Sequence, residues 1–144
     1  MNVDMHRARR VLRWSVIMAV LAAVGFASPA SAAATVNLWG PDSITSTGNY
    51  TYTASYLAPY ASFQWATRSC ATATVDSCTT AWTVAFGSYR DQFSETLTRY
   101  LTYTCPLSLK PTVNTYQVRV IGSAFGQPPQ TVYKVTNLCG DGPA

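Results

Sequence analysis

Apolar and polar positions alternate with a period of two along most of the chain beyond its first thirty-two residues, and no stretch there repeats every 3.6 residues. Threonine, valine and tyrosine dominate these stretches, and such residues suit the pleated surface of a β-sheet. The clearest example spans 49–57, where one face carries Tyr50, Tyr52, Ala54 and Tyr56 and the other carries hydroxyl residues. The pattern therefore predicts an all-β domain.

Seven such segments are separated by turn signals, chiefly glycine and proline. We expect strands at 35–39, 49–57, 62–68, 79–86, 93–103, 113–121 and 130–138, with a turn over 122–129. Seven short strands favour two packed antiparallel sheets. The predicted core consists of the large inward-facing residues Tyr52, Phe63, Trp65, Leu97, Leu101, Tyr116, Val118 and Val120. A bulge in the long fifth segment would turn Tyr100, Thr102 and Thr104 inward.

Four short motifs resemble those of a known family. They are Gly-Pro-Asp-Ser-Ile at 40–44, Gly-Asn-Tyr-Thr-Tyr-Thr-Ala at 48–54, Phe-Gln-Trp at 63–65 and Tyr-Gln-Val-Arg-Val at 116–120. The set resembles the bacterial immunoglobulin-like domains of exported proteins, including the PKD-like kind. The resemblance spans most of the chain beyond residue 32 and implies an immunoglobulin-like sandwich of about seven antiparallel strands in two sheets. These are fold motifs, and they carry no catalytic residues.

The first thirty-two residues have the pattern of a secretion signal peptide. A basic segment ending at Arg13 precedes an apolar stretch over 14–26, and Ala30-Ser31-Ala32 supplies the small residues for cleavage after Ala32. The apolar stretch is shorter than the ~20 residues that a membrane-spanning helix needs. We therefore expect a signal-peptide helix over 1–32, a secreted domain over 33–144, and no membrane association after cleavage.

Removal of the signal changes the charge of the protein. Four of the ten basic residues and one of the six acidic residues lie in 1–32, so the remainder holds six basic and five acidic side chains. The six basic residues are scattered along the sequence. Nucleic-acid binding needs a concentrated basic patch, so we expect no nucleic-acid partner.

The same removal takes away the single histidine, His6. A Ser-His-Asp or Cys-His arrangement is then impossible. The acidic pair Asp91 and Glu95 and the pair Ser108 and Lys110 are better interpreted as surface residues. The four cysteines lack the Cys-x-x-Cys spacing of zinc sites. The sequence thus predicts a protein that is not an enzyme and holds no metal or cofactor.

Four cysteines allow three pairings. Cys70 and Cys78 flank a short loop between adjacent strands, which favours a local bridge. Cys105 and Cys139 end two strands that would run in the same direction on opposite sheets, so a bridge between them would staple the sheets together. In the chain-entropy account the two bridges contribute about 2.5 and about 4 kcal/mol.

These features favour a secreted binding or structural module whose partner is another extracellular protein or a glycan. Exposed Trp or Tyr rings could stack on sugars or form a protein-binding patch, and Trp39 and Trp82 are our candidate contact residues. A small-molecule carrier is a further hypothesis, because the hairpin bridge resembles that of the enediyne apoproteins.

The alternative function is inhibition of a serine protease. The segment Cys105-Pro106-Leu107-Ser108 resembles the reactive-site segment of subtilisin-inhibitor-like proteins. That resemblance implies that Leu107–Ser108 is the bait bond, braced by Pro106 and by a disulfide at Cys105. A rigid loop of this kind binds tightly because little conformational entropy is lost on binding.

Overall fold

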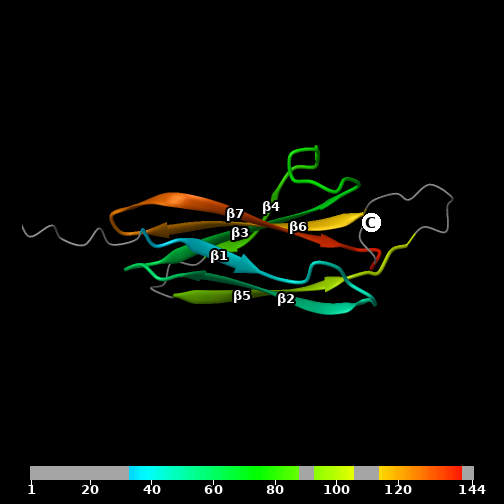
Figure 1. Cartoon of the computed structure of the whole chain (residues 1–144), viewed down its shortest axis with the longest axis horizontal. Helices are drawn as coiled ribbons and strands as arrows, with labels where there is room; N and C mark the ends of the chain where they lie inside the picture. The colour runs from blue at the N-terminus through cyan, green and yellow to red at the C-terminus, as the bar shows by residue number, and fades with distance from the viewer. Residues whose placement is uncertain (1–32, 88–92, 106–113, 141–144) are drawn as a thin grey trace, which may run out of the picture. The chain divides into compact units, whose positions relative to one another are not determined.

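The computed structural model describes residues 33–87, 93–105 and 114–140. Within these ranges the chain forms seven strands (Figure 1). They are β1 (Val36–Trp39), β2 (Gly48–Tyr56), β3 (Ser62–Cys70), β4 (Thr83–Gly87), β5 (Ser94–Leu101), β6 (Thr115–Ala124) and β7 (Gln127–Asn137). The predicted signal peptide at 1–32 lies outside the described residues. Nowhere in the described ranges does a helix have the length and hydropathy to cross a membrane.

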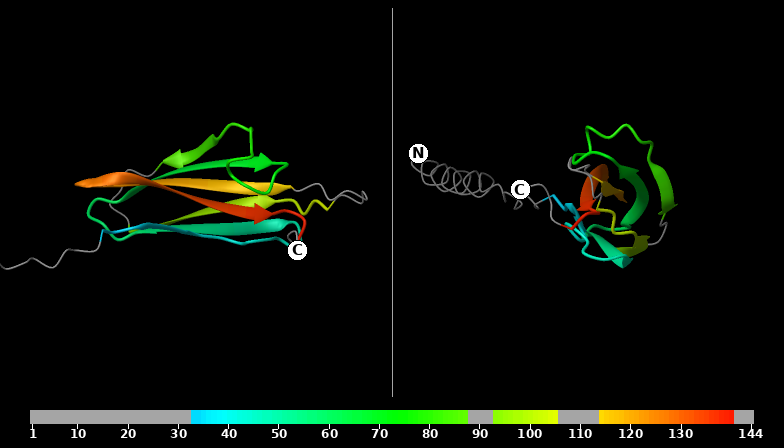
Figure 2. Two further views of the ribbon diagram at one scale, coloured as in Figure 1. Left: turned by 45° about the horizontal axis from the view of Figure 1, so that its top comes forward. Right: turned by 90° about the vertical axis from the view of Figure 1, so that its right-hand side faces the viewer.

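The seven strands form two layers, which Figure 2 shows edge-on. One sheet has the order β1-β2-β5 and the other has the order β4-β3-β6-β7. All neighbouring strands within the sheets are antiparallel. The prediction of an all-β fold with seven antiparallel strands in two sheets is therefore confirmed.

The core lies between the two sheets, and all eight side chains predicted for it are buried. Trp65 on β3 is fully enclosed and stacks on Phe86 of β4, with ring centroids 5.9 Å apart. Period-two alternation predicted these positions correctly because large apolar side chains gather on the face of each sheet that meets the other sheet.

A buried hydroxyl pair joins the two sheets through this core. Tyr52 on β2 lies 2.7 Å from the Thr136 hydroxyl on β7, and Thr136 donates its proton to the carbonyl of Pro41 at 2.8 Å. Since Thr136 has one hydroxyl proton, Tyr52 must be the donor of the first bond. Burial raises the pKa of Tyr52 to about 12, so this phenol stays neutral and remains a donor.

The segment after β1 changes sheets. β1 pairs with β2, but Ser43 then forms a parallel bridge with Asn137 at the end of β7. Ile44 donates to the Asn137 carbonyl at 3.0 Å, and the Asn137 amide donates to the Asp42 carbonyl at 2.8 Å. Near the other end of β7, the Gln130 side-chain amide hydrogen-bonds to the backbone at the start of β1. These contacts cover part of the β7 edge, which would otherwise be open for pairing with another chain.

The predicted turn over 122–129 is wrong in extent. β6 and β7 continue until only Phe125 and Gly126 separate them, and Gly126 has the left-handed φ of 71° that such a tight turn requires. Pro128 and Pro129 therefore lie within β7. They are tolerated because β7 is an edge strand and the pairing register shifts beside the turn.

Two other predicted strands are shorter than expected. β5 ends at Leu101 and pairs with β2 without a register shift, so Tyr100, Thr102 and Thr104 stay exposed rather than turning inward. The strand predicted from residue 79 begins only at Thr83, because the carbonyls of Cys78 and Thr80 accept hydrogen bonds from the Arg68 side chain on β3.

A glycine substitution tests the tight contact between the sheets. At Gly122 on the inner face of β6, a Cβ atom would collide with the Val36 methyl groups and lie 3.3 Å from the Tyr56 ring. We expect Gly122→Ala to lower the free energy of unfolding by about 1–3 kcal/mol, as overpacked cores do, measured by urea unfolding. The matched control is Gly48→Ala on β2, where a Cβ has open space. Equal unfolding midpoints for the two variants would contradict this packing.

Candidate functional site

Trp82, one of the two predicted contact residues, lies against side chains of the protein itself. Its ring is 4.1 Å from the guanidinium carbon of Arg68 and 4.9 Å from that of Arg119. The Tyr133 ring centroid is 5.8 Å away. These three partners come from β3, β6 and β7, so the half-buried indole covers the outer face of the four-stranded sheet through cation–π and ring contacts.

Arg68 is the centre of this cover. Its Nε donates to the Gln117 side chain at 2.8 Å, and its Nη2 donates to the carbonyl of Val75 at 2.6 Å. Its Nη1 donates to the carbonyls of Cys78 at 3.3 Å and Thr80 at 3.0 Å. The arginine is buried, and its planar fork of N–H donors bonds to three backbone carbonyls at once.

Further bonds fix the same loop to the sheet. Gln117 donates to the Thr74 carbonyl at 3.1 Å, and Thr115 donates to the Thr72 carbonyl at 2.7 Å. The Cys70–Cys78 disulfide closes the loop at its base. Residues 71–80 therefore cover the outer face of β3 and β6. No sequence pattern marks this role, because Arg68 is one of six basic residues scattered along the chain beyond residue 32.

The outer face of the other sheet, in contrast, is open. Three cross-strand pairs of hydroxyl residues follow one another along β2 and β5, and we call them the hydroxyl face. They are Ser55 with Ser94, Thr53 with Thr96, and Thr51 with Thr98. The last pair is joined by a hydrogen bond of 3.1 Å between hydroxyl oxygens.

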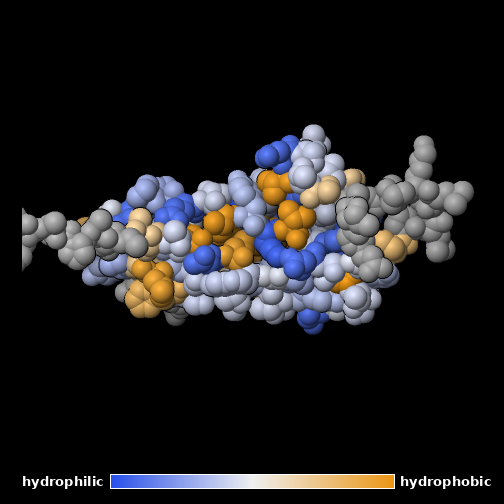
Figure 3. Space-filling model, in the orientation of Figure 1, coloured by the Kyte–Doolittle hydropathy of each residue, from blue (hydrophilic) through white to orange (hydrophobic). Residues whose placement is uncertain are grey.

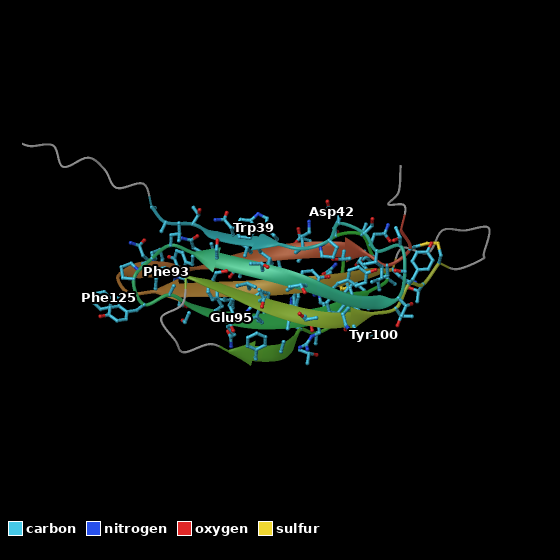
Figure 4. The ribbon with its side chains drawn as sticks, turned by 90° about the horizontal axis from the view of Figure 1, so that it is seen from below. Trp39, Asp42, Phe93, Glu95, Tyr100 and Phe125 are labelled. Atoms are coloured by element: carbon cyan, nitrogen blue, oxygen red, sulfur yellow. A yellow bond between two sulfur atoms is a disulfide. The ribbon has the colours of Figure 1, made fainter. Side chains whose placement is uncertain are left out.

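Two exposed rings lie beside the hydroxyl face. Trp39, the other predicted contact residue, is 55% exposed and pairs in register with Thr53. Tyr100 is 67% exposed and comes two residues after Thr98 on β5. Figure 4 looks onto this sheet and shows the two rings on either side of β2. The structure thus places Trp39 on an open surface, whereas Trp82 is engaged by its neighbours.

A second exposed apolar group lies at one end of the sandwich. We call it the apolar tip, and its members are Leu57, Tyr60, Phe93 and Phe125. Their exposed fractions are 76%, 70%, 54% and 78%. They come from the β2–β3 loop, the start of β5 and the β6–β7 turn. Phe93 and Phe125 lie at the same end of the sandwich in Figure 4, and Figure 3 shows apolar surface there.

Contacts join two members of the apolar tip, Tyr60 and Phe125. The rings of Tyr60 and Phe125 meet edge to face with centroids 6.2 Å apart, and the Phe125 amide donates to the Pro59 carbonyl at 3.1 Å. Tyr60 has a φ of 54°, a left-handed conformation that costs a non-glycine residue roughly 1–2 kcal/mol. Strain of this kind persists where the surrounding structure imposes it, and it concentrates at functional loops.

The Cys105–Cys139 bridge joins the ends of β5 and β7. Both predicted disulfides are therefore present, which is compatible with an extracellular location. The proposed inhibitory segment, with Pro106, Leu107 and Ser108, lies outside the described residues.

Charged groups form few clusters in the part of the chain that the structure describes. Lys134 makes a salt bridge with Asp42, and this hydrogen bond together with the lysine charge lowers the pKa of the Asp42 carboxyl. Within the same residues, no group of three or more His, Cys, Asp or Glu side chains could hold a metal ion.

Comparisons with known proteins leave the family open. No protein-family model and no curated protein matches this chain. A solved structure that does match is Spo0M, a sporulation control protein from Bacillus subtilis, with 11% sequence identity and a TM-score of 0.35. The match covers 74% of this chain and 49% of that one, so this chain spans about half the length of Spo0M. A TM-score of this size does not establish a common fold.

A conservative substitution tests the role of Arg68. We expect Arg68→Lys to lower the free energy of unfolding by about 2–4 kcal/mol, because an ammonium group cannot replace the fork that satisfies three carbonyls and Gln117. The matched control is Arg99→Lys on β5, where the arginine is half-buried, and there we expect a change below about 1 kcal/mol. Denaturant unfolding under non-reducing conditions measures both. A similar loss in the two variants would contradict this role.

Proposed function

We propose that this protein is a secreted, non-catalytic binding module with an immunoglobulin-like fold, and that the apolar tip contacts another extracellular protein. One observation carries the proposal: four large apolar side chains lie exposed at one end of the domain although the core is complete without them. Contiguous exposed apolar groups mark interaction sites more often than singly scattered ones do.

The strand arrangement supports the immunoglobulin-like part of the proposal. Such sandwiches pack two antiparallel sheets with Greek-key connections. The sheet orders β1-β2-β5 and β4-β3-β6-β7 fit this pattern, as does the move of the N-terminal segment from β2 to a parallel bridge with β7. In antibody variable domains, the loops between the second and third strands and before the last strand belong to the binding end. By analogy, the loops that carry Tyr60 and Phe125 occupy the equivalent places.

The chemistry of the tip favours a protein as the partner. Its four residues are uncharged, and three of them are aromatic. Aromatic residues are enriched in the cores of protein interfaces, where a few rings supply most of the binding energy. The T-shaped pair of Tyr60 and Phe125 is already ordered in the free domain, so little entropy is lost when it binds.

The remaining features support secretion and the absence of catalysis. Residues 1–32 have the composition of a signal peptide, and the domain beyond them contains two disulfides and no histidine. An oxidising environment preserves such bridges. A domain without histidine lacks the side chain that most often performs acid–base chemistry near neutral pH.

The left-handed conformation of Tyr60 provides a clean test. We expect Tyr60→Gly to change the free energy of unfolding by less than about 1 kcal/mol, because glycine adopts this φ without strain. The double variant Tyr60→Gly with Phe125→Ser should lose its protein partner. The measurement is chemical crosslinking of purified protein to proteins of the producing cells' surface and medium.

The matched control for this test is Trp39→Ala, which removes an exposed ring outside the tip. Support requires a crosslinked species that forms with the wild type and with Trp39→Ala but is lost in the tip variant. If every crosslinked species persists in the tip variant, the apolar tip is not the contact surface.

Protease inhibition is a second candidate function. The Cys105–Cys139 disulfide favours it, because the proposed bait segment directly follows Cys105 and would be braced by this bridge. We expect the protein to inhibit subtilisin stoichiometrically and Leu107→Gly to weaken the inhibition, as measured by titration with a chromogenic substrate. Full subtilisin activity in the presence of micromolar excess of the wild-type protein would eliminate this candidate.

A further inference from the structure

We infer that the hydroxyl face of β2 and β5, flanked by Trp39 and Tyr100, binds a neutral, extended polysaccharide. This surface consists of other residues than the apolar tip, which adjoins it beyond Ser55 and Ser94, and it adds a second binding activity to the proposed function. The inference combines three features of the sheet: a regular array of hydroxyl groups, two exposed rings at its margins, and the absence of charge on its outward positions.

The array presents six hydroxyl groups in three rows across two strands. Strand geometry sets the spacing: rows recur every second residue, about 6.7 Å apart, and neighbouring strands lie about 4.8 Å apart. Each hydroxyl group can donate one hydrogen bond and accept others. A chain of sugar rings carries hydroxyls with the same dual capacity, so the two surfaces can pair at several points along the chain.

The two rings define the direction of such a ligand. Trp39 lies beside the row of Thr53 and Thr96, and Tyr100 pairs in register with Asn49, two rows of outward residues further along β2. A line from Trp39 to Tyr100 therefore crosses the hydroxyl face diagonally. Aromatic faces carry partial negative charge and attract positive edges, and the C–H groups on a sugar ring supply such edges.

Threonine on the solvent side of an antiparallel sheet is common, so the array alone would not indicate a ligand. The further observation that indicates a neutral ligand is the distribution of charged residues on the sheet. β1, β2 and β5 are fully described, and none of their outward positions carries a charged residue. The charged residues Glu95 and Arg99 on β5 alternate with these positions and share the face of Leu97. This neutrality disfavours phosphate-rich or acidic ligands and suits an uncharged polysaccharide.

Sedimentation with insoluble polysaccharides tests the inference. The full chain, in the form in which it is purified, is mixed with cellulose, chitin or a linear β-1,3-glucan, and the fraction in the pellet is measured. We expect binding to at least one of them, and Trp39→Ala and Tyr100→Ala should each weaken it about tenfold, as the loss of one stacking ring implies. Thr96→Val, which keeps the shape but removes a hydroxyl, should weaken binding several-fold.

Controls separate this surface from the apolar tip and from charge effects. Tyr60→Ala should bind the polysaccharide like the wild type. Raising the salt from 0.1 to 1 M shortens the screening length from about 10 to about 3 Å and should leave binding unchanged. Failure to sediment with any of the three polysaccharides, undiminished binding by both ring variants, or release of the protein by salt would overturn the inference. Loss of binding in Tyr60→Ala alone would also overturn it by assigning the ligand to the tip.

Discussion

The buried guanidinium of Arg68 determines how the outer face of the four-stranded sheet is used. A buried charge requires full compensation, and here the partners are three carbonyls of residues 71–80, the Gln117 side chain and the Trp82 ring. In the folded domain these bonds replace the water that would otherwise solvate the guanidinium, so release of the loop would break all the bonds to its carbonyls. Together with the Cys70–Cys78 bridge, this interaction converts what would be an exposed sheet face into a second, polar layer of packing.

This closure divides the surface of the domain unequally. The face over β3 and β6 is covered by the protein's own loop, whereas the face over β1, β2 and β5 remains open and carries hydroxyl groups between two exposed rings. The β5 edge carries Glu95 and Arg99 on its inward side. Inward charges on an edge strand discourage pairing with another chain, so the β5 edge is protected from strand addition, whereas the outward hydroxyl groups face solvent.

The core and the two-sheet fold could be predicted from the sequence because large apolar residues alternate with polar ones along each strand, so that a period of two marks Trp65 or Val118 as core residues. The Arg68 network could not be predicted, because three of its four acceptors are backbone carbonyls, which every residue possesses. Two strand ends were predicted wrongly because they also depend on contacts between strands. A register shift between β6 and β7 accommodates Pro128 and Pro129 within β7. The bond from Arg68 to the Thr80 carbonyl keeps the segment before Thr83 out of β4. The apolar tip could not be predicted, because its four residues come from three connections that are far apart in the sequence and meet only in the folded domain.

The proposed binding surfaces are independent of the interactions that maintain the fold. Trp39, Tyr100 and the rings of the tip are largely exposed, so their loss removes little buried area, and the free energy of folding rests on the core, the disulfides and the Arg68 network. Trp82 is the opposite case: its ring packs on two arginines, so a substitution there would change stability together with any contact it makes. A domain arranged in this way can vary the residues that meet a partner, because those residues do not also hold the sheets together.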